Sequence, residues 1–67
     1  MKILLCGNAE QYENYLREHN LKPEDIRYIK DAYSLCGLHE PDLYVTGTWY
    51  NRKDITEIID QLQNIWP

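Results

Sequence analysis

The chain contains little cysteine, serine and glycine, and no phenylalanine. Its 67 residues hold two cysteines, one serine and three glycines. Two cysteines are too few for a disulfide scaffold, and Cys6 and Cys36 lack the spacing of a metal site. We therefore expect both to be small buried side chains in a reducing compartment, although a disulfide between them stays open.

The scarcity of glycine and serine also excludes the common catalytic and nucleotide-binding motifs. Gly7 stands where a nucleotide-binding fold carries its glycine loop, but the fingerprint needs three glycines and the P-loop needs a Gly-Lys-Ser or Gly-Lys-Thr run. Ser34 lies in no nucleophile elbow, and neither His19 nor His39 has metal ligands at a suitable spacing. The sequence thus predicts a protein that is not an enzyme, with no catalytic residue, metal site or cofactor.

Cations are outnumbered, and apolar runs are short. Seven Lys and Arg face eleven Asp and Glu, for a net charge of −4, whereas binding to a nucleic-acid backbone needs a basic footprint. The apolar run Ile3–Cys6 is far shorter than a signal-peptide core or a membrane span. We expect a cytoplasmic protein that contacts neither nucleic acid nor membrane directly.

The hydrophobic pattern alternates between strands and helices. Residues 2–6 and 26–29 predict two strands, with a helix between them that begins after Asn8 as its N-cap. One helical turn over residues 31–35 and a third strand over residues 43–46 follow. The last helix is expected to open at Asn51, which would cap it, and its apolar residues recur at helical spacing: Ile55, Ile58, Ile59, Leu62 and Ile65.

This β-α-β-β-α order predicts a minimal α/β fold, Rossmann-like or flavodoxin-like, as a single domain over residues 1–67. Right-handed crossovers favour a parallel three-stranded sheet in the order 2-1-3, with helices on both faces and with Leu5 and Val45 in the core. Antiparallel pairing of the second and third strands stays open, because their connection is short for a crossover. A chain this short gains stability from a second subunit, and the sheet leaves two edges to cover, so we expect a homodimer.

The most informative segment follows the third strand, at the point where ligands bind in such sheets. It combines aromatic side chains typical of interfaces with cations at the first turn of a helix, where the helix dipole disfavours positive charge. We predict that this segment forms a binding surface with Asn8 and that Arg52 is an exposed first-turn cation; its residues are Thr48, Trp49, Tyr50, Asn51 and Arg52. In the alternative interpretation, Asp54 offsets the charge, Lys53 pairs with Glu57, and Trp49 or Tyr50 closes the core.

Three stretches carry a resemblance to short α/β proteins encoded by tailed bacteriophages: residues 1–7, residues 27–29 and residues 45–55. The resemblance implies a setting in the host bacterial cytoplasm and a bacterial host protein as partner. The expected function is that of a non-catalytic accessory protein that modulates this partner, as a host-takeover or anti-defence inhibitor. The alternatives are a nucleotide- or phosphate-binding mini-domain and a small subunit of a phage assembly.

Overall fold

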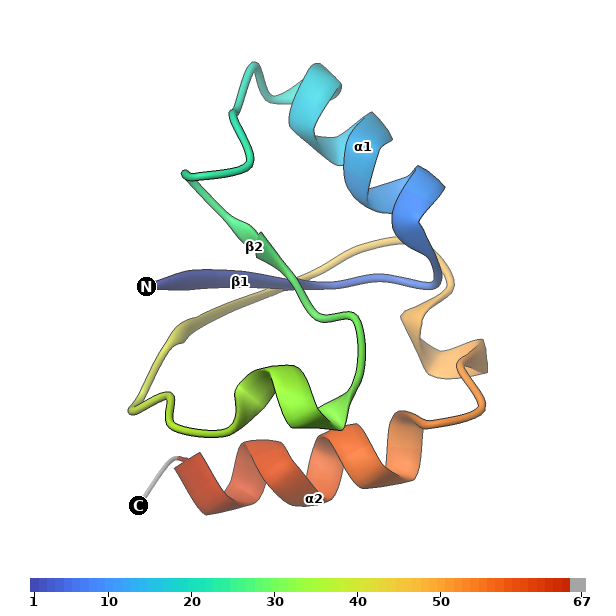
Figure 1. Ribbon diagram of the computed structural model, residues 1–67. Helices are drawn as coiled ribbons and strands as arrows, with labels where there is room; N and C mark the ends of the chain where they lie inside the picture. The colour runs from blue at the N-terminus through green and yellow to red at the C-terminus, as the bar shows by residue number, and fades with distance from the viewer. Residues whose placement is uncertain (66–67) are drawn as a thin grey trace.

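The computed structural model describes residues 1–65 and forms three layers, with a sheet between two helical layers (Figure 1). Strands β1 (Lys2–Leu5), β2 (Arg27–Tyr28) and β3 (Asp42–Val45) make the sheet. Helix α1 (Ala9–Glu18) lies on one face, and helix α2 (Ile55–Ile65) lies on the other with the 3-10 turn η1 (Ala32–Leu35). Trp66 and Pro67, which were expected to end the last helix, lie outside the described residues.

The sheet is parallel and its strand order is β2-β1-β3. This confirms the predicted α/β topology and excludes the antiparallel pairing of the second and third strands, because β1 separates them. The connection between β2 and β3 spans residues 29–41 and includes η1. It is therefore long enough to cross over β1 to the other edge of the sheet.

Local signals set the ends of α1. The Asn8 side chain accepts a hydrogen bond from the Gln11 N–H at 2.9 Å, as its predicted role of N-cap requires. At the other end Asn20 takes a positive φ of 54°, and the Leu21 N–H donates to Leu16 O at 2.8 Å. This is the hydrogen bond of a Schellman motif, which satisfies a carbonyl that the end of a helix leaves free.

The side chains of residues 3–6, in β1 and directly after it, alternate between two small cores. Leu4 and Cys6 pack with α1, whereas Ile3 and Leu5 pack with η1 and α2. The α1-side core is completed by Leu16 and Ile26. The α2-side core also contains Ile29, Leu35, Ile58, Leu62 and Ile65.

Strand β3 lies at the edge of the sheet and belongs to neither core. Leu5 is 2% exposed, as predicted, but the prediction that Val45 is buried is wrong, because Val45 is 50% exposed. All four residues of β3 are exposed, and neither core cluster includes one of them. The two helical layers cover β1 and leave both faces of β3 open.

The last helix begins at Ile55, three residues later than a cap at Asn51 predicts. Residues Trp49–Asn51 form a separate 3-10 turn, η2, and Asn51 lies within it instead of capping α2. The backbone is extended at Arg52, and the Ile58 N–H donates to Asp54 O at 3.0 Å at the start of α2. This break in the helical pattern is what lets the Arg52 side chain turn back to the sheet.

Candidate functional site

The carboxyl ends of β1 and β3 meet at a glutamine from α1. Gln11 Oε1 accepts hydrogen bonds from the Gly7 N–H at 2.7 Å and from the Thr48 N–H at 3.1 Å. Gln11 Nε2 donates to Thr48 Oγ1 at 2.9 Å. The point at which a doubly wound fold offers free N–H groups to a ligand is therefore closed by the chain's own side chain.

Two glycines make room for this amide. A Cβ at Gly7 would collide with Thr48 Oγ1 and come within 2.8 Å of Gln11 Oε1. A Cβ at Gly47 would come within 2.7 Å of Gln11 Cδ, and the φ of +63° at Gly47 already disfavours other residues. The single glycine after β1 thus admits a glutamine and not a phosphate.

Arg52 is a buried clamp between the strand ends. Its guanidinium donates to the carbonyl oxygens of Cys6 at 3.2 Å, of Ile29 at 2.6 Å and of Lys30 at 2.6 Å. Its side chain is only 7% exposed, so the prediction of an exposed first-turn cation is wrong. The carbonyl groups at the ends of β1 and β2 supply the partial negative charge that holds it.

Asp54 completes the charge balance of Arg52. The two side chains form a bidentate pair, with Nε to Oδ1 at 3.0 Å and Nη2 to Oδ2 at 3.1 Å. This geometry is the strong form of an arginine–carboxylate interaction. This confirms the part of the alternative interpretation in which Asp54 offsets the positive charge near the helix start. Arg52 stands there because its side chain binds Asp54 and the carbonyl groups at the strand ends.

The aromatic pair of η2 divides between core and surface. Trp49 is half-buried against the α2-side core, whereas Tyr50 is 60% exposed. Their rings meet edge to face, with centroids 5.7 Å apart and an interplanar angle of 86°. Tyr50 is therefore an exposed aromatic side chain that rests on a half-buried one.

The structure thus assigns different roles to the six predicted site residues. Tyr50 and Asn51 are exposed, Trp49 is half-buried and Arg52 is structural. Asn8 and Thr48 are exposed too, but their side chains hydrogen-bond to Gln11. Sequence reasoning missed Gln11; the only signal for it is an amide four residues after Gly7.

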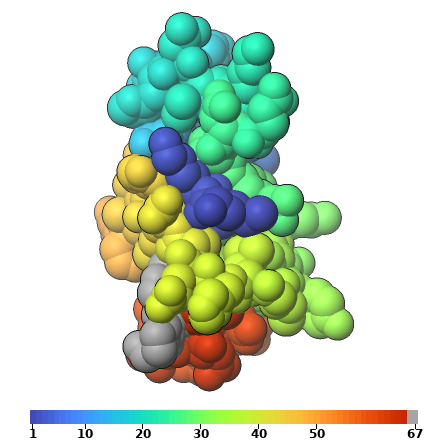
Figure 2. All heavy atoms as spheres, turned by 90° about the vertical axis from the view of Figure 1, so that its left-hand side faces the viewer, coloured from blue at the N-terminus to red at the C-terminus, as the bar shows by residue number. Residues whose placement is uncertain are grey.

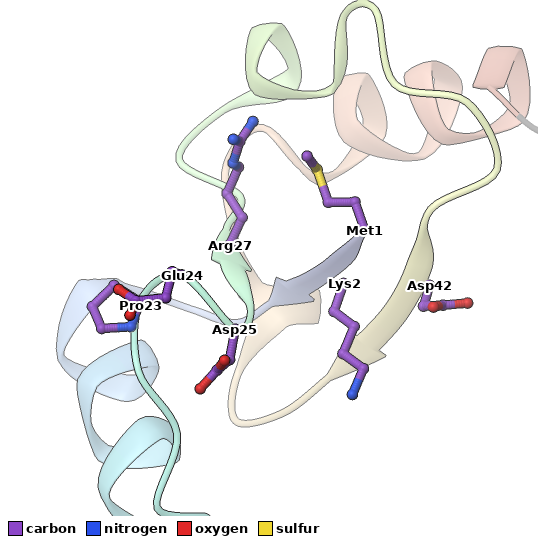
Figure 3. Close-up of a pocket in the computed structure, with 7 residues that line it drawn as sticks. All are labelled: Met1, Lys2, Pro23, Glu24, Asp25, Arg27 and Asp42. Atoms are coloured by element: carbon purple, nitrogen blue, oxygen red, sulfur yellow. The ribbon is translucent and has the colours of Figure 1, made fainter.

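A shallow hollow of about 610 Å³ lies at the opposite, amino-terminal ends of the strands. Its charged side chains do not converge: Figure 3 shows Met1 and Arg27 on the side of α2, while Lys2 and Asp25 extend the other way. The full lining is Met1, Lys2, Pro23, Glu24, Asp25, Arg27 and Asp42. Cations and anions that diverge in this way do not form a catalytic or ligand-binding constellation.

The pKa values of the buried Cys6 thiol and the half-buried Tyr12 phenol are raised, which favours the neutral form of each. Burial raises the pKa of the Cys6 thiol, although the positive charge of Arg52 partly counteracts this effect. Burial, and then Cys6, raise the pKa of the Tyr12 phenol, whose Oη donates to Ile26 O at 2.8 Å. Neither group is activated as a nucleophile. Among residues 1–65, no cluster of three or more His, Cys, Asp or Glu could hold a metal ion.

The two cysteines are free and differ in burial. Cys6 is buried as expected, but Cys36 is exposed, so the prediction for Cys36 is wrong. We expect iodoacetamide to modify Cys36 in the native protein within minutes and Cys6 only after denaturation, because reaction requires an accessible thiolate. Mass spectrometry of the peptides would check this order; modification of both thiols at equal rates in native buffer would contradict it.

Fold and site together define a minimal Rossmann-like α/β domain whose usual ligand position is filled from within. Comparison with protein-family models, with curated proteins and with solved structures found no match. No helix within residues 1–65 has the length and apolar character needed to cross a membrane.

Proposed function

We propose that this protein is a non-catalytic binding protein that docks on another protein through the surface around Tyr50. The partner proposed is a bacterial host protein in the bacterial cytoplasm, as the resemblance to phage-encoded proteins implies, and the role is modulation of that partner. The observation that carries the proposal is the exposed ring of Tyr50 on the half-buried ring of Trp49.

An aromatic side chain in this setting suits an interface for a physical reason. Tyr50 can bury a large apolar ring and keep its hydroxyl available for a hydrogen bond. Contact with Trp49, itself packed on the core, limits the side-chain entropy that Tyr50 would lose on binding. Tyrosine and tryptophan are enriched among the residues that dominate interface energies.

The carboxyl ends of the strands, where a doubly wound fold binds its ligand, are closed by Gln11 and Arg52. This closed switch point favours a protein-binding function over a nucleotide- or phosphate-binding mini-domain. A phosphate at the strand ends would need free backbone N–H groups. The N–H groups of Gly7 and Thr48 both donate to Gln11 Oε1, and the Arg52 guanidinium is engaged by carbonyls and Asp54. An anion would have to displace these internal partners first.

The test is capture of a partner from bacterial lysate with tagged wild-type protein, Tyr50→Ala and Tyr33→Ala. Tyr33 is the matched control, because it is 83% exposed and lies on a different turn, η1. We expect a partner that wild type and Tyr33→Ala retain and that Tyr50→Ala binds about 2 kcal/mol more weakly, roughly thirtyfold. Unchanged thermal melting of both variants would show that the loss is local.

Two results would overturn the proposal. Equal affinity of Tyr50→Ala and wild type for the captured partner would place the binding surface elsewhere. Saturable binding of inorganic phosphate or a nucleotide, without any protein partner, would support the mini-domain; capture of phage structural proteins alone from an infected lysate would support a subunit of a phage assembly.

A further inference from the structure

The outer edge of β3 carries backbone groups that nothing in residues 1–65 pairs. Asp42 N–H donates to Met1 O at 2.8 Å and Thr46 N–H donates to Leu5 O at 3.0 Å. Because N–H and C=O groups alternate in direction along a strand, Tyr44 also faces β1, and the groups of Leu43 and Val45 face outward. Figure 2 shows this segment, in yellow, at the surface of the molecule beside the dark blue amino-terminal residues.

We propose that a second copy of the chain pairs with this edge, antiparallel, about a two-fold axis through Tyr44. Leu43 of one copy then lies opposite Val45 of the other, and each such pair exchanges both of its outward hydrogen bonds. The two three-stranded sheets join into one continuous sheet, and the helices stay on their original faces, because the axis is perpendicular to the sheet.

Only one register uses the outward groups of both residues. A shift toward the amino end would place Val45 opposite Pro41, which has no N–H to donate. A shift toward the carboxyl end would place Leu43 opposite Gly47, whose φ of +63° takes it out of the strand. Pro41 and Gly47 thus limit β3 to a segment that is complementary to itself.

Side chains in this register are compatible as well. The two Tyr44 rings meet on the face of α1, and Leu43 packs beside Val45 of the second copy on the face of α2. These are exposed apolar side chains, at 39% for Leu43 and Tyr44, which the single chain leaves uncovered. Pairing covers them and satisfies the edge at the same time.

The side chains of β3 do not oppose pairing with a second copy of the same strand. Edge strands that avoid pairing usually carry a lysine or a proline, yet the segment from Asp42 to Thr46 has neither. Asp42 is its one charged residue, and it lies opposite Thr46, about 13 Å along the strand from Asp42 of the second copy. No like charges oppose each other.

The interface between two copies would consist of one short strand from each, which is a small contact. We therefore expect a dissociation constant in the micromolar range.

The first experiment measures mass by sedimentation velocity from about 1 μM to 1 mM. We expect the wild type to shift from monomer to dimer, and Val45→Pro to stay monomeric, because proline removes an outward N–H without touching the pairing of β3 with β1. Val45→Thr keeps the backbone donor and the β-branched shape, and it should still dimerise. A monomeric wild type at 1 mM, or a Val45→Pro variant that is folded and dimerises like the wild type, would overturn the proposal.

A cross-linking experiment tests the register and does not depend on the proline variant folding. In a Cys36→Ser background, Tyr44→Cys should form an intermolecular disulfide rapidly on mild oxidation, since the two positions face each other across the axis. Asp42→Cys is the matched control and should cross-link at least tenfold more slowly. Equal rates for the two variants would overturn this pairing. The proposed function does not depend on this result, because Tyr50 lies outside β3.

Discussion

Replacement of Arg52 by alanine should lower the free energy of unfolding by roughly 3 kcal/mol. The substitution removes the donors to three backbone carbonyls and leaves the Asp54 carboxylate without its partner. For a chain of this size the total stability is only about 3–10 kcal/mol, so the melting temperature should fall by more than about 10 °C. Thermal melting followed by circular dichroism would measure the change.

Arg52→Lys is the control for this prediction. Lysine keeps the positive charge, but a single ammonium cannot reach three carbonyls and both oxygens of Asp54 with the geometry of a planar guanidinium. We expect Arg52→Lys to be intermediate in stability. Melting of Arg52→Ala at the wild-type temperature would mean that water satisfies these carbonyls at no cost, and that Arg52 is not a clamp.

The secondary structure and topology follow from local signals in the sequence. The apolar run after Met1 and the cap at Asn8 both act through near neighbours, and both lie where the sequence predicts them. The parallel order follows from the handedness of crossovers and the alternation of strands and helices. These features depend on contacts that are close along the chain or on rules that hold for most folds.

Burial at the edge of the sheet could not be predicted in the same way. Val45 and Leu5 both belong to apolar strands, and nothing in their local sequence separates an edge strand from a central one. Their exposure differs because β1 lies between its two neighbours and both helical layers cover it. Cys36 shows the same limit: it has an apolar neighbour in Leu35, which is buried, but it is itself exposed.

The segment that the sequence singles out does lie at the carboxyl end of β3, but the interpretation of Arg52 as an exposed cation is wrong. The sequence showed a cation near a helix start and no compensating charge except Asp54. Asp54 supplies a full negative charge, and the rest of the compensation comes from backbone carbonyls at Cys6, Ile29 and Lys30, which are more than twenty residues away. Carbonyl groups carry no sequence signature, so no pattern of residue types could reveal this clamp.

Gln11 was missed for a related reason. An amide on the first turn of a helix reads as a solvent-facing residue, and its partner Thr48 is 37 residues away. Gln11 and Arg52 together tie the ends of all three strands through polar contacts: Gln11 joins β1 to β3, and Arg52 joins β1 to β2. Side chains of the chain itself thus hold the end of the sheet where larger folds of this class bind a ligand.

Gly47→Ala should lower the free energy of unfolding by about 2–3 kcal/mol, through a backbone effect and a steric effect that can be measured separately. An alanine at φ +63° costs about 1 kcal/mol or more, and its Cβ collides with the Gln11 amide, which three hydrogen bonds hold in place. Gly37→Ala is the matched control, because its φ of +83° is similarly strained but nothing lies within 4 Å of the added Cβ.

A double-mutant cycle with Gln11→Ala isolates the second part of the cost. In that background the three atoms nearest to the added Cβ are gone, so Gly47→Ala should cost only the backbone term, about as much as Gly37→Ala, with a coupling energy of about 1 kcal/mol. Urea unfolding of the four proteins in the cycle and of Gly37→Ala gives every value needed. Additive costs, or equal costs for Gly47→Ala and Gly37→Ala in the wild-type background, would mean that the amide moves aside freely. The strand ends would then be open to a ligand, and the proposal of a closed switch point would fail with them.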